Sequence, residues 1–138
     1  MIGRILKGTY KILDEVGQGG IATVYLARNL QTGETVAVKV IHSHIAAAEK
    51  SFLSRFQREA EILRSLSNPH IPRYFDSGLE DGLNYIVIEY IQGISVADVI
   101  KQRRQLDVEM ALDIVRQTAE GLQCTHEEGI VHRDIKPA

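Results

Sequence analysis

"GQGGIATVYLARNLQTGETVAVKVI", residues 17–41, carries the patterns that decide the fold. Two runs rich in β-branched and apolar residues, at 23–29 and 35–41, flank the turn sequence "LQTGE". Such runs are typical of strands on a pleated, half-buried surface. A similar run at 10–16 precedes the glycines. The stretch therefore predicts a three-stranded antiparallel meander.

Outward from this meander, the pattern changes to helix and then back to strand. Apolar residues at helical spacing predict a helix from about Ala47 to Leu66, which ends before Pro69. Two further strands are predicted around 71–78 and 84–91, joined through an Asp-Gly turn that is a strong hairpin signal. We therefore expect a five-stranded antiparallel sheet with one inserted helix.

The chain beyond Gly93 is predicted to be helical. Ser95 followed by Asp98 resembles a capping box that opens a short helix, and Asp107 is placed to cap a longer one. The order of elements, five strands with one inserted helix and then helices, indicates an α+β fold. The apolar face of the longer helix consists of Val108, Ala111, Leu112, Val115, Ala119 and Leu122.

Composition limits the classes of partner. The 138 residues have a formal net charge of -2, without the basic excess that is usual in proteins that bind nucleic acid or anionic membranes. The sequence has no apolar run of the length that a spanning helix requires. Cys124 is the only cysteine, which excludes an intrachain disulfide and favours a reducing compartment. We expect a cytoplasmic segment that contacts neither nucleic acid nor membrane.

Two charged residues stand where apolar residues are expected. Glu59 lies in the middle of the apolar stripe of the predicted helix, and Lys39 lies in a strand that is apolar on both faces. A buried unpaired charge costs several kcal/mol, so one ion pair between them would account for both positions. The alternative is that Glu59 lies at the solvent edge of the stripe and Lys39 extends to water, and these residues alone favour neither. The stripe consists of Phe52, Phe56, Ala60, Leu63 and Leu66.

The glycines at 17, 19 and 20 lie between two predicted strands, where absent side chains let backbone N–H groups approach a phosphate. Taken alone, such glycines more often mark a tight turn. A dinucleotide-binding loop would open a helix, and a Walker A loop would end in Gly-Lys-Ser or Gly-Lys-Thr. A β-branched strand follows this loop, so neither of those folds is expected, and a nicotinamide enzyme is disfavoured.

Four motifs, taken in order, resemble the eukaryotic-like protein kinase fold. They are G-x-G-x-x-A-x-V at 17–24, V-A-V-K at 36–39, the inward Glu59, and H-R-D-x-K at 132–136. In detail the chain looks like bacterial serine/threonine kinases. The resemblance covers the chain from about Tyr10 and about half of such a domain. It implies a small lobe with a five-stranded antiparallel sheet, helix C and a hinge over residues 1–92. Residues 93–138 would be the first helices of a large lobe, truncated within the catalytic loop.

The resemblance implies an ATP site. Lys39, oriented by Glu59, would hold the α- and β-phosphates, and the loop glycines would cover them. Val24 and Ala37 would contact the adenine ring, and backbone groups of the hinge would meet its edge. The expected cofactor-binding positions, with Ile88 as gatekeeper and Ser95 near the ribose, are Val16, Gly17, Gln18, Gly19, Gly20, Val24, Ala37, Lys39, Ile88, Glu89, Ile91 and Ser95.

The resemblance also implies catalytic roles beside those of Lys39 and Glu59. Asp134 matches the carboxylate that accepts the proton of the substrate hydroxyl, and Lys136 matches the lysine of kinases that act on protein Ser or Thr. Leu63, Tyr74 and His132 match a hydrophobic spine, so packing is expected for His132. Four other histidines match nothing in the family. His42 and His44, in "HSH", are expected to be solvated loop residues rather than metal ligands, and His70 and His126 are the other two.

The positions at which the family holds Mg²⁺ lie beyond residue 138. Its metal-binding Asn would fall one position after Ala138, and the D-F-G segment later, so no metal ligand and no catalysis are expected from these residues alone. The apolar face of the longer helix is expected to be exposed and to favour self-association. Kinases of this type often continue into a membrane anchor, which leaves the location of an intact protein open.

Two functions remain. The first is the front half of an ATP-dependent serine/threonine protein kinase that phosphorylates protein substrates. The second is a natural half-kinase that binds a nucleotide or a partner kinase without transferring phosphate. Lys39, Glu59, Asp134 and Lys136 in matching positions favour the first, because Asp134 has no evident use in a pure binder. The missing metal ligands favour the second for the chain taken alone.

Overall fold

The computed structural model describes residues 1–42, 50–132 and 135–137, with side chains for all of these except 50–52. The chain divides into two compact units. The first consists of Met1–Ser65 with Pro72–Ile91, and the second of Leu66–Ile71 with Gln92–Ala138. Each unit is described by itself.

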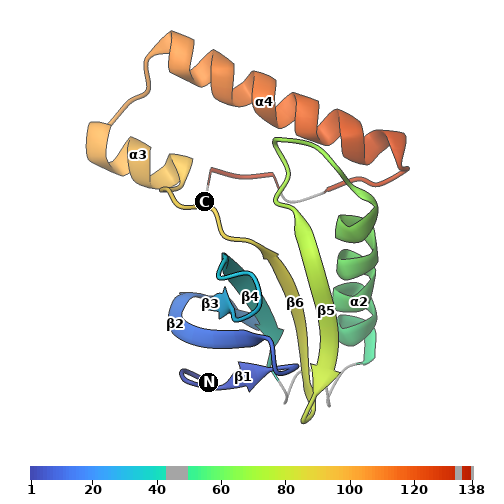
Figure 1. Cartoon of the computed structure of the whole chain (residues 1–138). Helices are drawn as coiled ribbons and strands as arrows, with labels where there is room; N and C mark the ends of the chain where they lie inside the picture. The colour runs from blue at the N-terminus through green and yellow to red at the C-terminus, as the bar shows by residue number, and fades with distance from the viewer. Residues whose placement is uncertain (43–49, 133–134, 138) are drawn as a thin grey trace. The chain divides into compact units, whose positions relative to one another are not determined.

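The first unit is built on a six-stranded antiparallel sheet of order β1-β2-β3-β4-β6-β5 (Figure 1). The predicted meander is present as β2, β3 and β4. The expectation of five strands is wrong by one, because β1 has two residues and is too short to show an alternating pattern. The strands are β1 Ile5–Leu6, β2 Tyr10–Gln18, β3 Ala22–Asn29, β4 Thr35–Ile41, β5 Tyr74–Glu80 and β6 Leu83–Glu89.

Both faces of β4 are covered, which explains why its sequence is apolar throughout. Its even-numbered residues, Val36, Val38 and Val40, pack into one core cluster, whereas Ile41 belongs to a second. That second cluster joins the sheet to helix α2, Lys50–Ser65, which lies beside β5 (Figure 1). The helix ends one residue before the predicted Leu66, and its predicted start at 47–49 lies outside the described residues. The side chain of Phe52, in the predicted stripe, is also outside them.

Ion pairs join the two outer strands of the sheet, β1 and β5, through residues in or next to them. Lys7, just after β1, places its Nζ 2.8 Å from Oδ2 of Asp76 in β5, and Arg4 pairs with Asp81 at the end of β5. Because β1 and β5 are at opposite ends of the strand order, these contacts require the sheet to curl until its edges meet. The curled face encloses the first core cluster, which consists of Leu6, Tyr10, Ile12, Ala27, Val36, Val38, Val40, Tyr85 and Val87.

Three ionisable groups at this closure bind their protons more tightly in the folded protein. Burial, helped by the negative charge of Asp76, raises the pKa of the Tyr10 and Tyr85 phenols above the ordinary 10.0. The hydrogen bond to Asp76 raises the pKa of Lys7 above 10.5. A raised pKa in the folded state stabilises that state below the unfolded pKa, and this stability is lost as pH rises through the folded value.

We therefore expect the free energy of unfolding to fall as pH is raised above about 10. Urea titrations followed by circular dichroism at pH 8 to 11 would measure this slope. The double variant Tyr10→Phe/Tyr85→Phe should show a shallower fall, because only the Lys7 contribution of the three remains. An equal slope in the double variant would show that the buried phenols do not cause it.

The β5–β6 hairpin has the predicted turn. Glu80 pairs with Leu83, and the two residues between them, Asp81 and Gly82, have φ of 49° and 77°. Positive φ at both central residues is typical of the type I′ turn that an Asp-Gly pair favours. β5 begins at Tyr74 rather than 71, because the Ile71 N–H is used in a turn to the Asn68 carbonyl and Pro72 has no N–H to donate.

The second unit contains two helices, α3 Val96–Arg103 and α4 Val108–Glu127, with both predicted caps. The hydroxyl of Ser95 accepts the Asp98 N–H at 3.2 Å, and the carboxylate of Asp107 accepts the Met110 N–H at 2.8 Å. Each cap satisfies one of the N–H groups left without a partner at a helix start. No helix among the described residues is long and apolar enough to cross a membrane.

The loop Leu66–Ile71 packs on α4 within the second unit. Nε2 of His70 lies 2.8 Å from Oε2 of Glu120. At the neighbouring Gly121, a Cβ atom would lie 3.4 Å from the carbonyl oxygen of His70, so a side chain there would crowd the loop. The pKa of Glu120 is lowered mainly by its hydrogen bond from Arg116. The carboxylate beside His70 is therefore kept in its charged form.

Candidate nucleotide site

The structure joins the two charges that the sequence left unexplained. Lys39 is in β4, and its Nζ lies 2.6 and 2.9 Å from the two carboxylate oxygens of Glu59 on α2. In the sheet register Lys39 lies opposite Val24 on one side and Ile86 on the other. Since Ile86 packs with α2 in the second core cluster, Lys39 is on the face of the sheet that meets this helix.

This ion pair is not buried, contrary to the sequence argument for it. The side chains of Lys39 and Glu59 are 28% and 42% exposed. Pairs with this much solvent contact contribute at most about 1 kcal/mol, so the fold itself has little need of the pair. The partial exposure leaves a positive charge, held in place by a carboxylate, accessible from outside the sheet.

The glycine loop connects β2 to β3. Gly17 and Gln18 are the last residues of β2, so the loop itself starts at Gly19, whose N–H donates to the Ala22 carbonyl at 2.8 Å. None of the loop glycines has a positive φ, and a Cβ at Gly17 or Gly20 would meet no described atom within 4 Å. The fold itself therefore does not require glycine at these positions. Glycine would be required if a ligand such as a phosphate had to approach the loop backbone closely.

Apolar residues extend this site on the same face of the sheet. Ala37 lies two residues before Lys39 in β4, where it pairs with Leu26 and with Ile88, and it is buried. Val24 lies directly opposite Lys39 and is half-buried. Val16, near the end of β2, is exposed. Val24 and Ala37 thus place apolar side chains beside the cation, as a purine ring would need.

The segment after β6 was expected to offer backbone groups to the adenine edge. The N–H of Glu89 donates to the Arg73 carbonyl at 2.8 Å, and the Glu89 carboxylate accepts the Arg73 N–H at 3.1 Å. The Glu89 N–H is thus already used within the protein and cannot serve as an adenine donor in this arrangement. Ile91, which ends the first unit, is exposed.

The remaining predicted residues belong to the second unit or lie outside the described residues. Ser95 caps α3, and its hydroxyl is 2.7 Å from Oδ2 of Asp98, so it has a structural task in this conformation. Lys136 and His132 are exposed, and Asp134 lies outside the described residues. Of the three spine positions, Leu63 and Tyr74 pack together against the second core cluster of the first unit, whereas His132 is in the second unit.

One contact near the loop contradicts the sequence-based expectation. His42 is half-buried rather than solvated, with Nε2 2.9 Å from Oγ1 of Thr23, and its N–H donates to the Ile21 carbonyl at 3.0 Å. The available signal was strand alternation, because His42 continues the face of β4 that holds Val40. The other half of the "HSH" pair, His44, lies outside the described residues.

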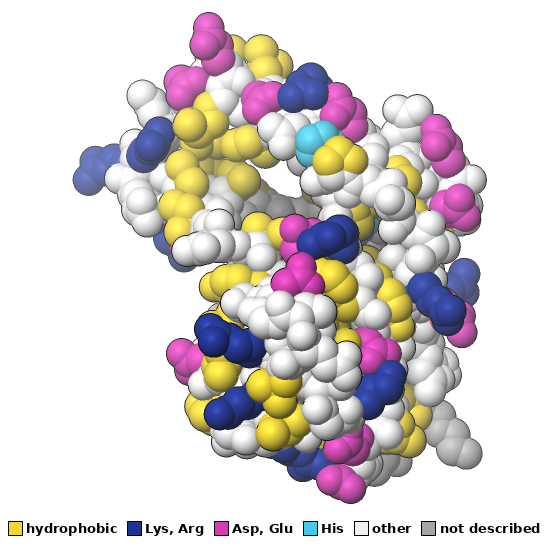
Figure 2. All heavy atoms as spheres, in the orientation of Figure 1, with side chains coloured by type: hydrophobic (Ala, Val, Ile, Leu, Met, Phe, Trp, Pro, Cys, Tyr) yellow, Lys and Arg dark blue, Asp and Glu magenta, His cyan; other side chains and the backbone are white. Residues whose placement is uncertain are grey.

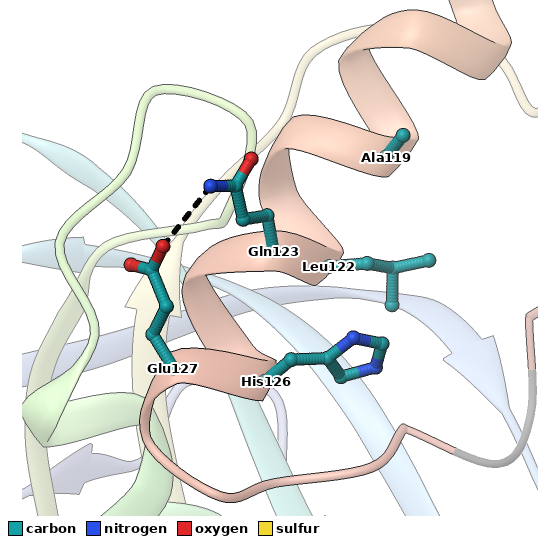
Figure 3. A pocket seen from close by; sticks show the side chains of 5 residues that line it. All are labelled: Ala119, Leu122, Gln123, His126 and Glu127. Atoms are coloured by element: carbon teal, nitrogen blue, oxygen red, sulfur yellow. Dashed lines mark hydrogen bonds between the residues drawn. The ribbon is translucent and has the colours of Figure 1, made fainter.

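A separate open hollow of about 500 Å³ lies at the end of α4 and contains none of the predicted site residues. Ala119, Leu122 and His126 project from one side of the helix, and Gln123 donates to Glu127 at 3.0 Å (Figure 3). Earlier on α4, the predicted apolar face is exposed at Val108, Leu112 and Val115. Hydrophobic side chains are visible on this unit in the space-filling view (Figure 2).

Curated relatives are serine/threonine kinases of bacteria. The chain is 41% identical over 137 residues to a probable serine/threonine-protein kinase of Clostridium perfringens, with 99% of this chain and 20% of the relative covered. It is 39% identical to the serine/threonine-protein kinase PrkC of Bacillus subtilis, with 99% of this chain and 21% of PrkC covered. The chain thus spans about a fifth of the length of these relatives.

Solved structures give the same assignment. The crystal structure of the Mycobacterium tuberculosis PknI kinase domain is similar with a TM-score of 0.84 at 31% identity, and the match covers 100% of this chain and 56% of that one. A family model described as the protein kinase domain matches residues 10–138. The fold, the order of the motifs and these matches agree, and the chain belongs to the protein kinase family.

Proposed function

We propose that this chain is the ATP-binding part of a serine/threonine protein kinase, which transfers the γ-phosphoryl group of ATP to Ser or Thr hydroxyls of protein substrates. The observation that carries the proposal is the partly exposed Lys39–Glu59 ion pair on the sheet face that also holds Val24 and Ala37. A stable fold gains little from this pair, whereas a bound triphosphate gains a fixed cation.

The first unit supplies the residues that bind the nucleotide in this proposal. Lys39 binds the α- and β-phosphates, and Glu59 holds its ammonium group in position. Gly17, Gly19 and Gly20 let the loop backbone approach the phosphates. The purine ring lies on the apolar surface of Val16, Val24 and Ala37, with Ile88 behind it, and its edge meets backbone groups near Glu89 and Ile91. The protein kinase family uses ATP with Mg²⁺, which neutralises phosphate charge during transfer.

The second part of the chain supplies the groups for transfer. In the proposal, residues 1–92 are the small lobe with its hinge, and residues 93–138 begin the large lobe. Asp134 accepts the proton of the substrate hydroxyl, and Lys136 neutralises charge on the transferred phosphoryl group. Ser95 would approach the ribose only by giving up its bond to the Asp98 carboxylate. The lysine at 136 supports Ser or Thr as the acceptor.

The half-kinase alternative is not favoured, because the relatives of this chain are named as serine/threonine kinases. The proposal also places this segment in the cytoplasm, where a single free cysteine stays reduced.

Isothermal titration of the 138-residue chain with ATP tests the proposal. We expect a single site with a dissociation constant in the range of about 1 μM to 1 mM, which is usual for enzyme substrates. Adenosine should bind more weakly, because it cannot contact Lys39. A chain that is folded by circular dichroism and binds neither ligand at millimolar concentration would contradict the proposal.

A further inference from the structure

His42 contacts the residues that lead out of the glycine loop. It follows β4 directly and lies three residues after Lys39. Its backbone N–H donates to the carbonyl of Ile21 at 3.0 Å, and its imidazole Nε2 lies 2.9 Å from the hydroxyl of Thr23. His42 thus contacts both the last residue of the loop, Ile21, and the second residue of β3, Thr23.

The position of Thr23 is fixed by burial and by strand pairing on both sides. It is 5% exposed and is paired with Gln18 in β2 and with Val40 in β4. A buried hydroxyl without a hydrogen-bond partner is costly, so the contact with His42 fixes the imidazole as well as the threonine. Because Thr23 and Val40 are paired, the side chains of Thr23 and His42 lie on the same face of the sheet.

The glycine loop, between β2 and β3, has few other contacts that fix its backbone among the described residues. A Cβ atom at Gly20 would meet no described atom within 4 Å, and a Cβ atom at Gly19 would meet only the Ala22 carbonyl oxygen, at 3.4 Å. The Gly19 N–H donates to that same carbonyl, so the loop is closed by this one contact among the described residues. Backbone freedom of this kind must be given up when a ligand is bound, and a contact that removes it beforehand raises affinity.

We propose that His42 is a positioning residue, which fixes the glycine loop relative to the strand that carries Lys39 so that both meet the phosphates of the nucleotide. This inference rests on the proposed function, since it assigns His42 a role in the same site. His42 itself does not touch the nucleotide in this proposal. It acts through Ile21 and Thr23.

Titration of the 138-residue chain with ATP and with adenosine separates this role from a general structural one. We expect His42→Ala and the isosteric Thr23→Val each to weaken ATP binding about tenfold, the size expected for one buried hydrogen bond. Adenosine affinity should change less than about twofold, because it has no phosphates for the loop to cover. The double variant should be no weaker than either single variant, since both remove the same contact.

Two controls complete the experiment. Thr23→Ser keeps the hydroxyl and should retain wild-type ATP affinity, and His126→Ala removes an exposed histidine from α4 and should change nothing. Equal weakening of ATP and adenosine, or wild-type affinity for ATP in both His42→Ala and Thr23→Val, would overturn the positioning role. A wild-type chain that binds no ATP would instead overturn the proposed function, and the positioning role with it.

Discussion

Replacing Lys39 with methionine should weaken ATP binding by about 10- to 100-fold and leave the chain folded. Methionine is similar to lysine in length and apolar volume but carries no charge. The loss is expected because a charge-assisted contact to phosphate disappears. It is enlarged by Glu59, whose carboxylate lies 2.6 Å from Nζ in the wild type and would face the phosphates without compensation in the variant.

The fold should tolerate this substitution because the pair is partly solvated. Its two side chains are 28% and 42% exposed, so its loss should cost at most about 1 kcal/mol in the free energy of unfolding. Glu59→Gln should have a smaller effect on ATP affinity, since the amide oxygen still accepts a hydrogen bond from Lys39 while the cation remains.

A matched control is Lys11→Met, the same substitution at an exposed position of β2 in the same sheet. It should leave the ATP dissociation constant within about twofold of the wild type, as expected for a surface site outside the ligand contact. If Lys39→Met binds ATP as tightly as the wild type, Lys39 does not lie at the phosphates, and the residue roles built on it are wrong.

Local features of the fold were the ones that the sequence could predict. The meander follows from alternation within single strands, and the Asp81-Gly82 hairpin needs only two adjacent residues. The caps at Ser95 and Asp107 each act over three positions. In all these cases the interacting groups are close in sequence, so their chemistry can be read without knowing how distant segments pack.

Features that depend on distant segments could not be predicted in the same way. The contact between Lys7 and Asp76 joins residues 69 positions apart and depends on how far the sheet curls. From the sequence, Lys39 and Glu59 could either pair with each other or extend separately to solvent. The sequence alone does not decide, because the rotation of α2 over β4 is set by the packing of residues such as Phe56. The place of His42 beside Thr23 depends on the register of β3 against β4, which no local pattern fixes.

The second large effect is expected at Phe56, where substitution by alanine should lower the free energy of unfolding of the first unit by about 3–5 kcal/mol. Phe56 is 5% exposed and packs with Ile41, Ala60 and Ile86 in the cluster that joins α2 to the sheet. It is the largest of these four buried side chains. Its removal leaves a cavity that a helix and a strand can fill only by moving closer, and their backbones limit that movement.

Tyrosine fluorescence makes this measurement specific to the first unit. The chain has no tryptophan, and all five of its tyrosines lie in the first unit. Urea titrations of Phe56→Ala should therefore show an earlier fluorescence transition. Leu112→Ala, which removes an exposed side chain from α4, should shift the tyrosine transition by less than about 0.5 kcal/mol.

Phe56 also connects core packing to the nucleotide site. It lies one helical turn before Glu59, and the Lys39 ammonium is 6.0 Å from the centre of its ring, within reach of a weak cation–π attraction. Phe56→Ala should therefore weaken ATP binding even under conditions in which the variant remains folded, whereas Phe56→Leu should retain more of both properties. A variant that loses stability but binds ATP normally would show that the Lys39–Glu59 geometry does not depend on how α2 is packed.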